Sequence, residues 1–128
     1  MSLEDLKKSF IVDEESFEEN RIEELVGKIN KICQVDKKGH IKFLREGLGD
    51  RDKIKYTLIA RFLANKLEES IPKEVTNEEL EIILNKSKEQ VRARLSDLRK
   101  EKQNSMRDIN KNTHEIKPMF LSKILENE

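Results

Sequence analysis

Apolar residues between positions 75 and 100 recur with the period of an α-helix, in two groups divided by a short polar stretch. The groups are Leu80, Ile83 and Leu84, followed by Val91, Leu95 and Leu98. Residues three and four positions apart share one face of a helix, so each group predicts a helix with one buried side. The polar residues 85–87 predict a tight turn between helices at 76–84 and 88–100.

Both helices also begin with the same pattern of side chains. Thr76 stands three residues before Glu79, and Ser87 stands three residues before Gln90. In this arrangement, a capping box, each side chain bonds the backbone N–H of the other residue. The pattern predicts that the two helices start directly after Thr76 and Ser87.

The apolar pattern predicts two more helices before residue 36. The first is short and carries Leu3, Leu6 and Phe10 on one face. Ser16 and Glu19 form a third capping box, which opens a helix extending to about residue 35. The buried face of that second helix is predicted to comprise Ile22, Leu25, Val26, Ile29, Ile32 and Cys33.

Residues 35–49 predict a small β element followed by a joint. His40–Leu44 alternates between apolar and polar residues, which indicates a short strand, and Val35–Asp36 is a candidate partner across the turn at 37–39. Gly47 and Gly49 indicate a flexible joint. We therefore divide the chain into an N-terminal element of helix and short hairpin at 1–49, with a role in dimerisation, and a domain at 50–128.

A long helix is expected from residue 51 to about residue 69. Asp50 is the predicted cap, and Pro72 ends the helical segment because proline lacks the backbone N–H. The residues predicted to face inward are Ile54, Leu58, Ile59, Phe62, Leu63 and Leu67.

The segment 101–116 allows two interpretations. Asn110–Asn112 suits a turn before the alternating Thr113–Ile116, which predicts a β-hairpin. The apolar period also continues through Met106 and Ile109, and neither Gly nor Pro occurs between residues 88 and 118, so a longer helix ending near residue 110 is the rival. Beyond it, Pro118 suits the first turn of a last helix. Its apolar side would be Phe120, Leu121, Ile124 and Leu125.

The stretch IILNKSKEQVRARLSDLRK resembles the second and third helices of winged helix-turn-helix transcription regulators, and the resemblance extends over about residues 50–116. It implies a mainly α fold with a small β component, in which the helix at 51–69 braces the motif and a hairpin, the wing, follows the third helix. We favour this hairpin over the longer helix. The family usually ends the third helix with Gly and two apolar residues, whereas this chain has Lys102, Gln103 and Asn104 there.

The resemblance makes the third helix a candidate reader of DNA. With its apolar residues turned inward, Gln90, Arg92 and Ala93 face solvent, and such Gln and Arg side chains can bond adenine and guanine. Substituting Gln90, Arg92 or Lys100, whose side chains face solvent, is expected to change folding stability little. The candidate DNA-binding residues are Lys86, Ser87, Lys88, Gln90, Arg92, Ala93, Arg94, Ser96, Lys100, Arg107 and Lys111.

Charge supports this assignment only in part. The chain has zero net charge, but residues 1–24 carry nine acids and three bases, and residues 86–111 carry nine bases and four acids. A DNA-binding protein needs positive charge only on the docking face. Glu89 and Asp97 would repel phosphate unless nearby bases neutralise them.

Other classes of function find little support. His40 and His114 lie in unrelated segments without a neighbour at metal-ligand spacing, and lone histidines of this kind are usually at the surface or on an edge strand. There is no Gly-rich phosphate loop or nucleophile motif, so we expect neither an enzyme nor a cofactor. The single Cys33 is expected to be a buried apolar side chain in a reducing compartment. The chain is predicted to be cytoplasmic, without a membrane segment.

The sequence therefore predicts a DNA-binding winged helix-turn-helix protein that regulates transcription from double-stranded DNA. A homodimer is expected because one such motif reads few base pairs. The alternative is a winged-helix module that binds other proteins without touching DNA, which the neutral total charge and the acidic N-terminal segment would suit. Nothing in the sequence indicates a small-molecule effector.

Overall fold

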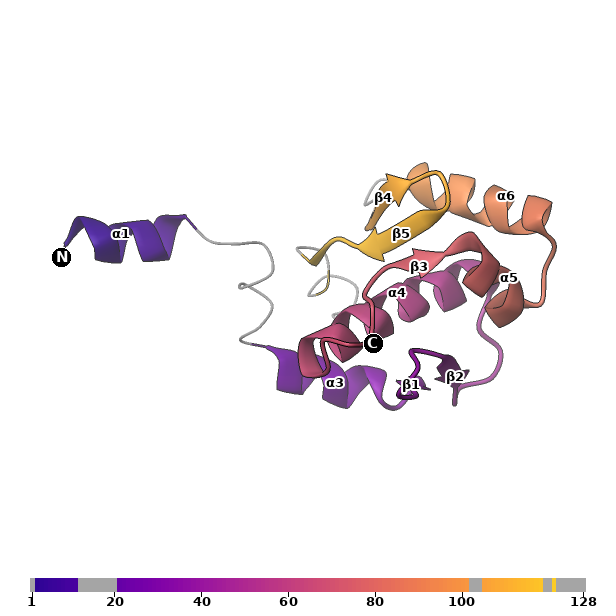
Figure 1. The fold of residues 1–128 in the computed structure, drawn as a ribbon, viewed down its shortest axis with the longest axis horizontal. Helices are drawn as coiled ribbons and strands as arrows, with labels where there is room; N and C mark the ends of the chain where they lie inside the picture. The colour runs from indigo at the N-terminus through magenta and orange to yellow at the C-terminus, as the bar shows by residue number, and fades with distance from the viewer. Residues whose placement is uncertain (1, 12–20, 102–104, 119–120, 122–128) are drawn as a thin grey trace.

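A computed structural model describes residues 2–11, 21–101, 105–118 and 121. The described elements are mainly helices, accompanied by two small antiparallel sheets, as expected (Figure 1). In chain order they are α1 (Leu3–Phe10), α3 (Ile22–Ile29), β1 (Cys33–Val35), β2 (Ile41–Phe43), α4 (Asp50–Leu67), β3 (Val75–Thr76), α5 (Asn77–Leu84), α6 (Lys88–Arg99), β4 (Met106–Asn110) and β5 (Thr113–Ile116).

Helix α4 is the centre of the molecule. It contacts α3 and β1 on one side and α5, α6 and the sheet on the others, so every residue from Tyr56 to Leu63 is buried. Of the six residues predicted to face inward, five are buried. The prediction is wrong for Leu67, which is 66% exposed. Leu67 is the last residue of the helix, and no described element covers it there. The predicted cap is also wrong: Gly49 is the N-cap, and Asp50 already belongs to the first turn.

The predicted helix from residue 16 to about 35 is wrong at its C-terminal end. Helix α3 stops at Ile29, and Cys33–Val35 instead pairs with Ile41–Phe43 as an antiparallel hairpin. The turn of this hairpin is fixed by Asp36, whose Oδ1 accepts from the backbone N–H groups of Lys38 and His40, both at 2.9 Å. The Ser16–Glu19 capping box lies outside the described residues.

The residues assigned to the apolar face of that helix are nevertheless mostly buried. Leu25, Ile29, Ile32 and Cys33 belong to the core, although the last two reach it from a turn and a strand. Burial raises the pKa of the Cys33 thiol to about 11, as expected for an apolar rather than a reactive cysteine. Residues of α4 belong to the same core, so side chains before and after the joint at 47–49 pack together. The division of the chain at residue 49 stays a prediction.

Arg61 joins the N-terminal hairpin to the rest of the chain. Its side chain is 3% exposed in the middle of α4 and forms an ion pair with Glu79 of the first capping box. The guanidinium also donates to the carbonyl oxygens of Gly39 at 3.2 Å, Pro72 at 2.6 Å and Glu74 at 2.8 Å. One buried cation thereby connects the β1–β2 turn, the segment after α4 and the start of α5.

The two helices predicted at 76–84 and 88–100 are present as α5 and α6. Both capping boxes are complete, and Asn85 closes α5 with the left-handed backbone (φ 54°) that allows a sharp turn. Of the predicted apolar residues Ile83 is only half-buried, while the other five are buried.

A hairpin follows α6, so the longer helix is excluded. Helix α6 ends at Arg99, and β4 and β5 pair antiparallel around a turn at Lys111–Asn112 (Figure 1). Strand β3 pairs with β5, giving a three-stranded sheet in the order β3–β5–β4. Beyond the sheet, Leu121 is buried, and most of the predicted last helix lies outside the described residues. None of the described helices has the length and apolar character required to cross a membrane.

Candidate nucleic-acid interface

The predicted DNA-binding residues lie on the turn before α6, along α6 and on the hairpin. Most are exposed, whereas Arg94, Ser96 and Arg107 are half-buried. Ala93 is exposed among longer side chains, which would let the helix backbone approach a surface closely. The exposed members are Lys86, Ser87, Lys88, Gln90, Arg92, Ala93, Lys100 and Lys111.

Ser87 and Gln90 have a structural task that limits what they can bind. Ser87 Oγ accepts from the Gln90 N–H at 3.2 Å, and Gln90 Oε1 accepts from the Ser87 N–H at 3.0 Å. Bidentate recognition of adenine needs both the oxygen and the NH2 group of a glutamine amide. While the cap is intact, the Gln90 NH2 group can still donate, but a bidentate contact with adenine would have to share the Gln90 oxygen with the Ser87 N–H.

Three of the arginines are paired within the chain. Arg99 Nε lies 2.8 Å from Asp108 Oδ2, and Arg107 Nη1 lies 3.2 Å from Glu115 Oε1. Arg94 Nε lies 3.3 Å from Asp97 Oδ2, in a geometry that makes an ion pair without a hydrogen bond. The predicted local neutralisation of Asp97 is thus present, and Arg94 and Arg107 are weaker candidates for contacts to phosphate.

Within the described structure, the other basic residues of the predicted set have no acidic partner in an ion pair. Across the described parts of the chain, no ion pair involves Lys86, Lys88, Arg92, Lys100 or Lys111, and all five are exposed. We refer to these five residues as the open bases. A surface cation outside any ion pair gives up little within the chain when it meets a phosphate, so these residues are the most favourable contacts in the predicted set, although the charge of Lys88 also acts on Glu78.

Most acids of the same region are neutralised internally. Glu101 Oε2 lies 2.9 Å from the Nζ of Lys55, a residue in the first half of α4. Asp97 and Asp108 have arginine partners. Glu89 is the exposed acid for which the described structure shows no ion pair. Each of these pairs also uses a base, so the net charge of the region is unchanged, but the described bases left outside the ion pairs are the open bases.

The tip of the hairpin is attached to the start of α5. Asn112 Nδ2 donates to Glu78 Oε2 at 2.8 Å, and the Asn112 carbonyl oxygen accepts from the Asn77 N–H at 3.0 Å. The hydrogen bond from Asn112, together with smaller contributions that include the charge of Lys88, lowers the pKa of Glu78. Lys111 is therefore presented from a turn that is fixed to the start of α5.

His114 holds the hairpin from inside, which sequence reasoning missed. It is fully buried on the central strand, so the expectation of a surface or edge-strand residue is wrong for His114. Its Nδ1 lies 2.7 Å from Asp108 Oδ1, and its Nε2 lies 2.6 Å from Asn77 Oδ1. The one available signal was its inward position in the alternating pattern of residues 113–116. His40, in contrast, is exposed as expected.

Asp108 links this buried histidine to the helix above it. Burial alone would raise the pKa of the Asp108 carboxyl group, but hydrogen bonds and charge from Arg99 and His114 outweigh it, and the pKa is lowered. The described residues contain no group of three His, Cys, Asp or Glu side chains arranged to hold a metal ion. The network therefore fixes the position of the hairpin relative to α6 and α5.

Comparison of the chain with protein-family models, with curated proteins and with solved structures gave no match.

Proposed function

We propose that the chain binds double-stranded DNA as a winged helix-turn-helix protein and regulates transcription. In this proposal α6 enters the major groove, and the hairpin of β4 and β5 serves as a short wing. The observation that carries it is the separation of charges on one surface. The open bases all lie on α6, the turn before it and the hairpin, while three other arginines of the region, Arg94, Arg99 and Arg107, are paired with acids.

The local geometry supports a division of roles among these residues. Lys86 and Lys88 flank the N-terminus of α6, where backbone N–H groups and the helix dipole favour a phosphate. Arg92 lies one turn further along the exposed side and can reach the edge of a guanine. Lys100 and Lys111, at the end of α6 and on the hairpin turn, would contact the backbone on either side of the groove.

The salt dependence of binding to random duplex DNA tests the proposal. If all five open bases contact phosphates, the logarithm of the affinity should fall with the logarithm of salt concentration at a slope of roughly −4 to −5. Lys88→Ala or Lys100→Ala should each flatten that slope by about one phosphate contact. Arg94→Ala is the matched control, because this arginine already has Asp97 as partner, and its effect on the slope should be smaller.

Arg92 is expected to distinguish sequences. On a cognate site, Arg92→Ala should weaken binding by about 1–3 kcal/mol and relax the preference at one base pair. The same substitution should weaken binding to random duplexes by a smaller amount. A cognate site can be selected from a randomised pool with the wild-type chain before the variants are compared.

The alternative is a module that binds another protein through the same motif. Ile82 favours it, because this large apolar side chain is 81% exposed on α5, beside the helix proposed to read DNA. Binding that does not depend on salt, or the absence of any binding to duplex DNA, would make this second function the better account. Loss of a protein partner on Ile82→Glu would then identify the surface.

A further inference from the structure

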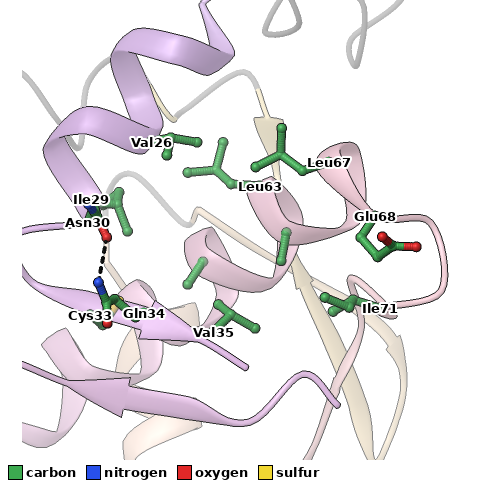
Figure 2. Close-up of a pocket in the computed structure, with 12 residues that line it drawn as sticks. Val26, Ile29, Asn30, Cys33, Gln34, Val35, Leu63, Leu67, Glu68 and Ile71 are labelled. Carbon is green, nitrogen blue, oxygen red and sulfur yellow. Dashed lines mark hydrogen bonds between the residues drawn. The ribbon is translucent and has the colours of Figure 1, made fainter. Parts of the chain in front are cut away.

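An apolar groove lies on the side of the molecule formed by α3, β1 and the C-terminal half of α4. It has a volume of about 350 Å³. Figure 2 shows Val26 of α3, Val35 of β1, and Leu63 and Leu67 of α4 converging on it. Leu67 was predicted to face the core, and its exposure now has an explanation, since it forms one wall of this groove.

A second apolar surface of the same chain is also uncovered. Helix α1 is well formed, with Ser2 Oγ accepting from the Asp5 N–H at 3.2 Å, and Figure 1 shows it standing away from the other elements. Leu3 and Phe10, which share one face, are 84% and 89% exposed, and Ile11 directly after the helix is 66% exposed. An apolar face of this kind is typical of a helix that packs in a groove of a partner.

Charge at the edges of the two surfaces is complementary. Among the described residues that line the groove, Glu68 is the charged one, and it lies on the rim (Figure 2). On α1, Lys7 follows Leu3 by four positions and so borders the apolar face. Both side chains are exposed, and a helix laid in the groove could bring the lysine and the glutamate together.

We propose that the α1 helices of two copies of this chain exchange, each occupying the groove of the other copy. One exchange covers both apolar surfaces in both copies and closes with two-fold symmetry, so no surface is left to continue the assembly. A second copy is the favoured source because α1 extends away from its own groove in the single chain (Figure 1). The N-terminal element at 1–49 was expected to take part in dimerisation, but the apolar face predicted for its second helix is largely used by the chain's own core.

Sedimentation equilibrium over a range of concentrations, without DNA, tests this exchange. The wild-type chain should be a dimer, and Phe10→Glu on the helix and Leu67→Glu in the groove should each weaken self-association by about tenfold or more. Ile82→Glu is the matched control, because it places the same charge at an equally exposed apolar position outside the groove and should leave the dimer intact. Circular dichroism should show all three variants folded, because all three positions are exposed.

Reversal of the two charges identifies the groove as the docking site. Lys7→Glu and Glu68→Lys should each weaken the dimer, and the double variant should recover much of the wild-type affinity. A wild-type monomer overturns the proposal, including the case in which α1 folds into its own groove. A dimer weakened by Phe10→Glu but not by Leu67→Glu overturns it too, because α1 would then contact another surface. None of these outcomes depends on DNA binding, so the two proposals can fail separately.

Discussion

Arg61 is the residue whose removal should cost the most stability. Taking away a buried charge leaves its partners without compensation, and losses of about 3–5 kcal/mol are usual for such a change. Arg61→Ala strands the Glu79 carboxylate and three carbonyl oxygens at once, so we expect a loss in that range by urea denaturation.

An exposed arginine of the same helix provides the control. Arg51 lies 3.8 Å from Glu101 with 55% of its side chain exposed, and surface pairs of this kind contribute about 0–1 kcal/mol. Arg51→Ala should therefore change the free energy of unfolding little. Equal effects of the two substitutions would show that the Arg61 contacts do not stabilise the fold.

Asp108 should make stability depend on pH in the acid range. Its pKa is lower in the folded chain than in the unfolded chain, where it is about 3.9. The stabilisation is therefore complete above that value and is lost as the pH falls below about 4 through the folded pKa. Asp108→Asn should be less stable than the wild type at pH 7, and the difference should shrink towards pH 2.5. Urea denaturation at a series of pH values measures it; a constant difference would contradict the assignment.

At the scale of elements, substitutions at the N-terminal cap of α6 can distinguish an effect on folding stability from an effect on DNA binding. Gln90→Ala was expected to be neutral for stability, but it removes a hydrogen bond of the capping box and should cost about 0.5–1.5 kcal/mol. Gln90→Glu preserves the box, since glutamate is the usual residue there, and an acid in the first turn suits the helix dipole.

The pair of variants then reports on DNA binding. Gln90→Glu should keep the wild-type melting temperature and yet bind duplex DNA more weakly, because it places a negative charge beside phosphates and removes the NH2 donor. Thermal denaturation and a binding titration on the same sample provide the comparison. Unchanged DNA affinity in Gln90→Glu would remove this position from the interface.

At the scale of the whole molecule, the shared core predicts how truncations behave. A chain lacking residues 1–49 would expose the side of α4 that now packs on Leu25, Ile29 and Ile32. It should lose cooperative unfolding, because the buried area it gives up is a large part of a small core. A chain lacking residues 1–11 should keep its unfolding transition at concentrations where the wild type is monomeric, since none of the described α1 side chains belongs to the core. Guanidinium denaturation followed by circular dichroism compares them; a cooperative fold of 50–128 alone would support two independent domains.

The sequence by itself determined the elements whose signals are local. Thr76 and Glu79, and Ser87 and Gln90, are three residues apart, so each capping box is complete within one turn and needs no distant partner. The apolar period of α6 is equally local, and it placed Val91, Leu95 and Leu98 in the core correctly. The candidate surface could be predicted to the same extent, because the side opposite a buried stripe must face solvent.

Only the tertiary structure decided the features that join distant residues. Cys33–Val35 continues the helical period of α3 but becomes a strand, because Ile41–Phe43 offers backbone partners beyond a turn. The segment 106–116 is a hairpin because β3 supplies a third strand from nearly forty residues before its partner β5. The partners of charged side chains are also set by the tertiary structure, since Asp108 meets Arg99 and His114 only once the sheet has formed. Such pairs distinguish the open bases from the bases that already have an acidic partner. Spacing along a chain cannot show which of several nearby acids a base will meet.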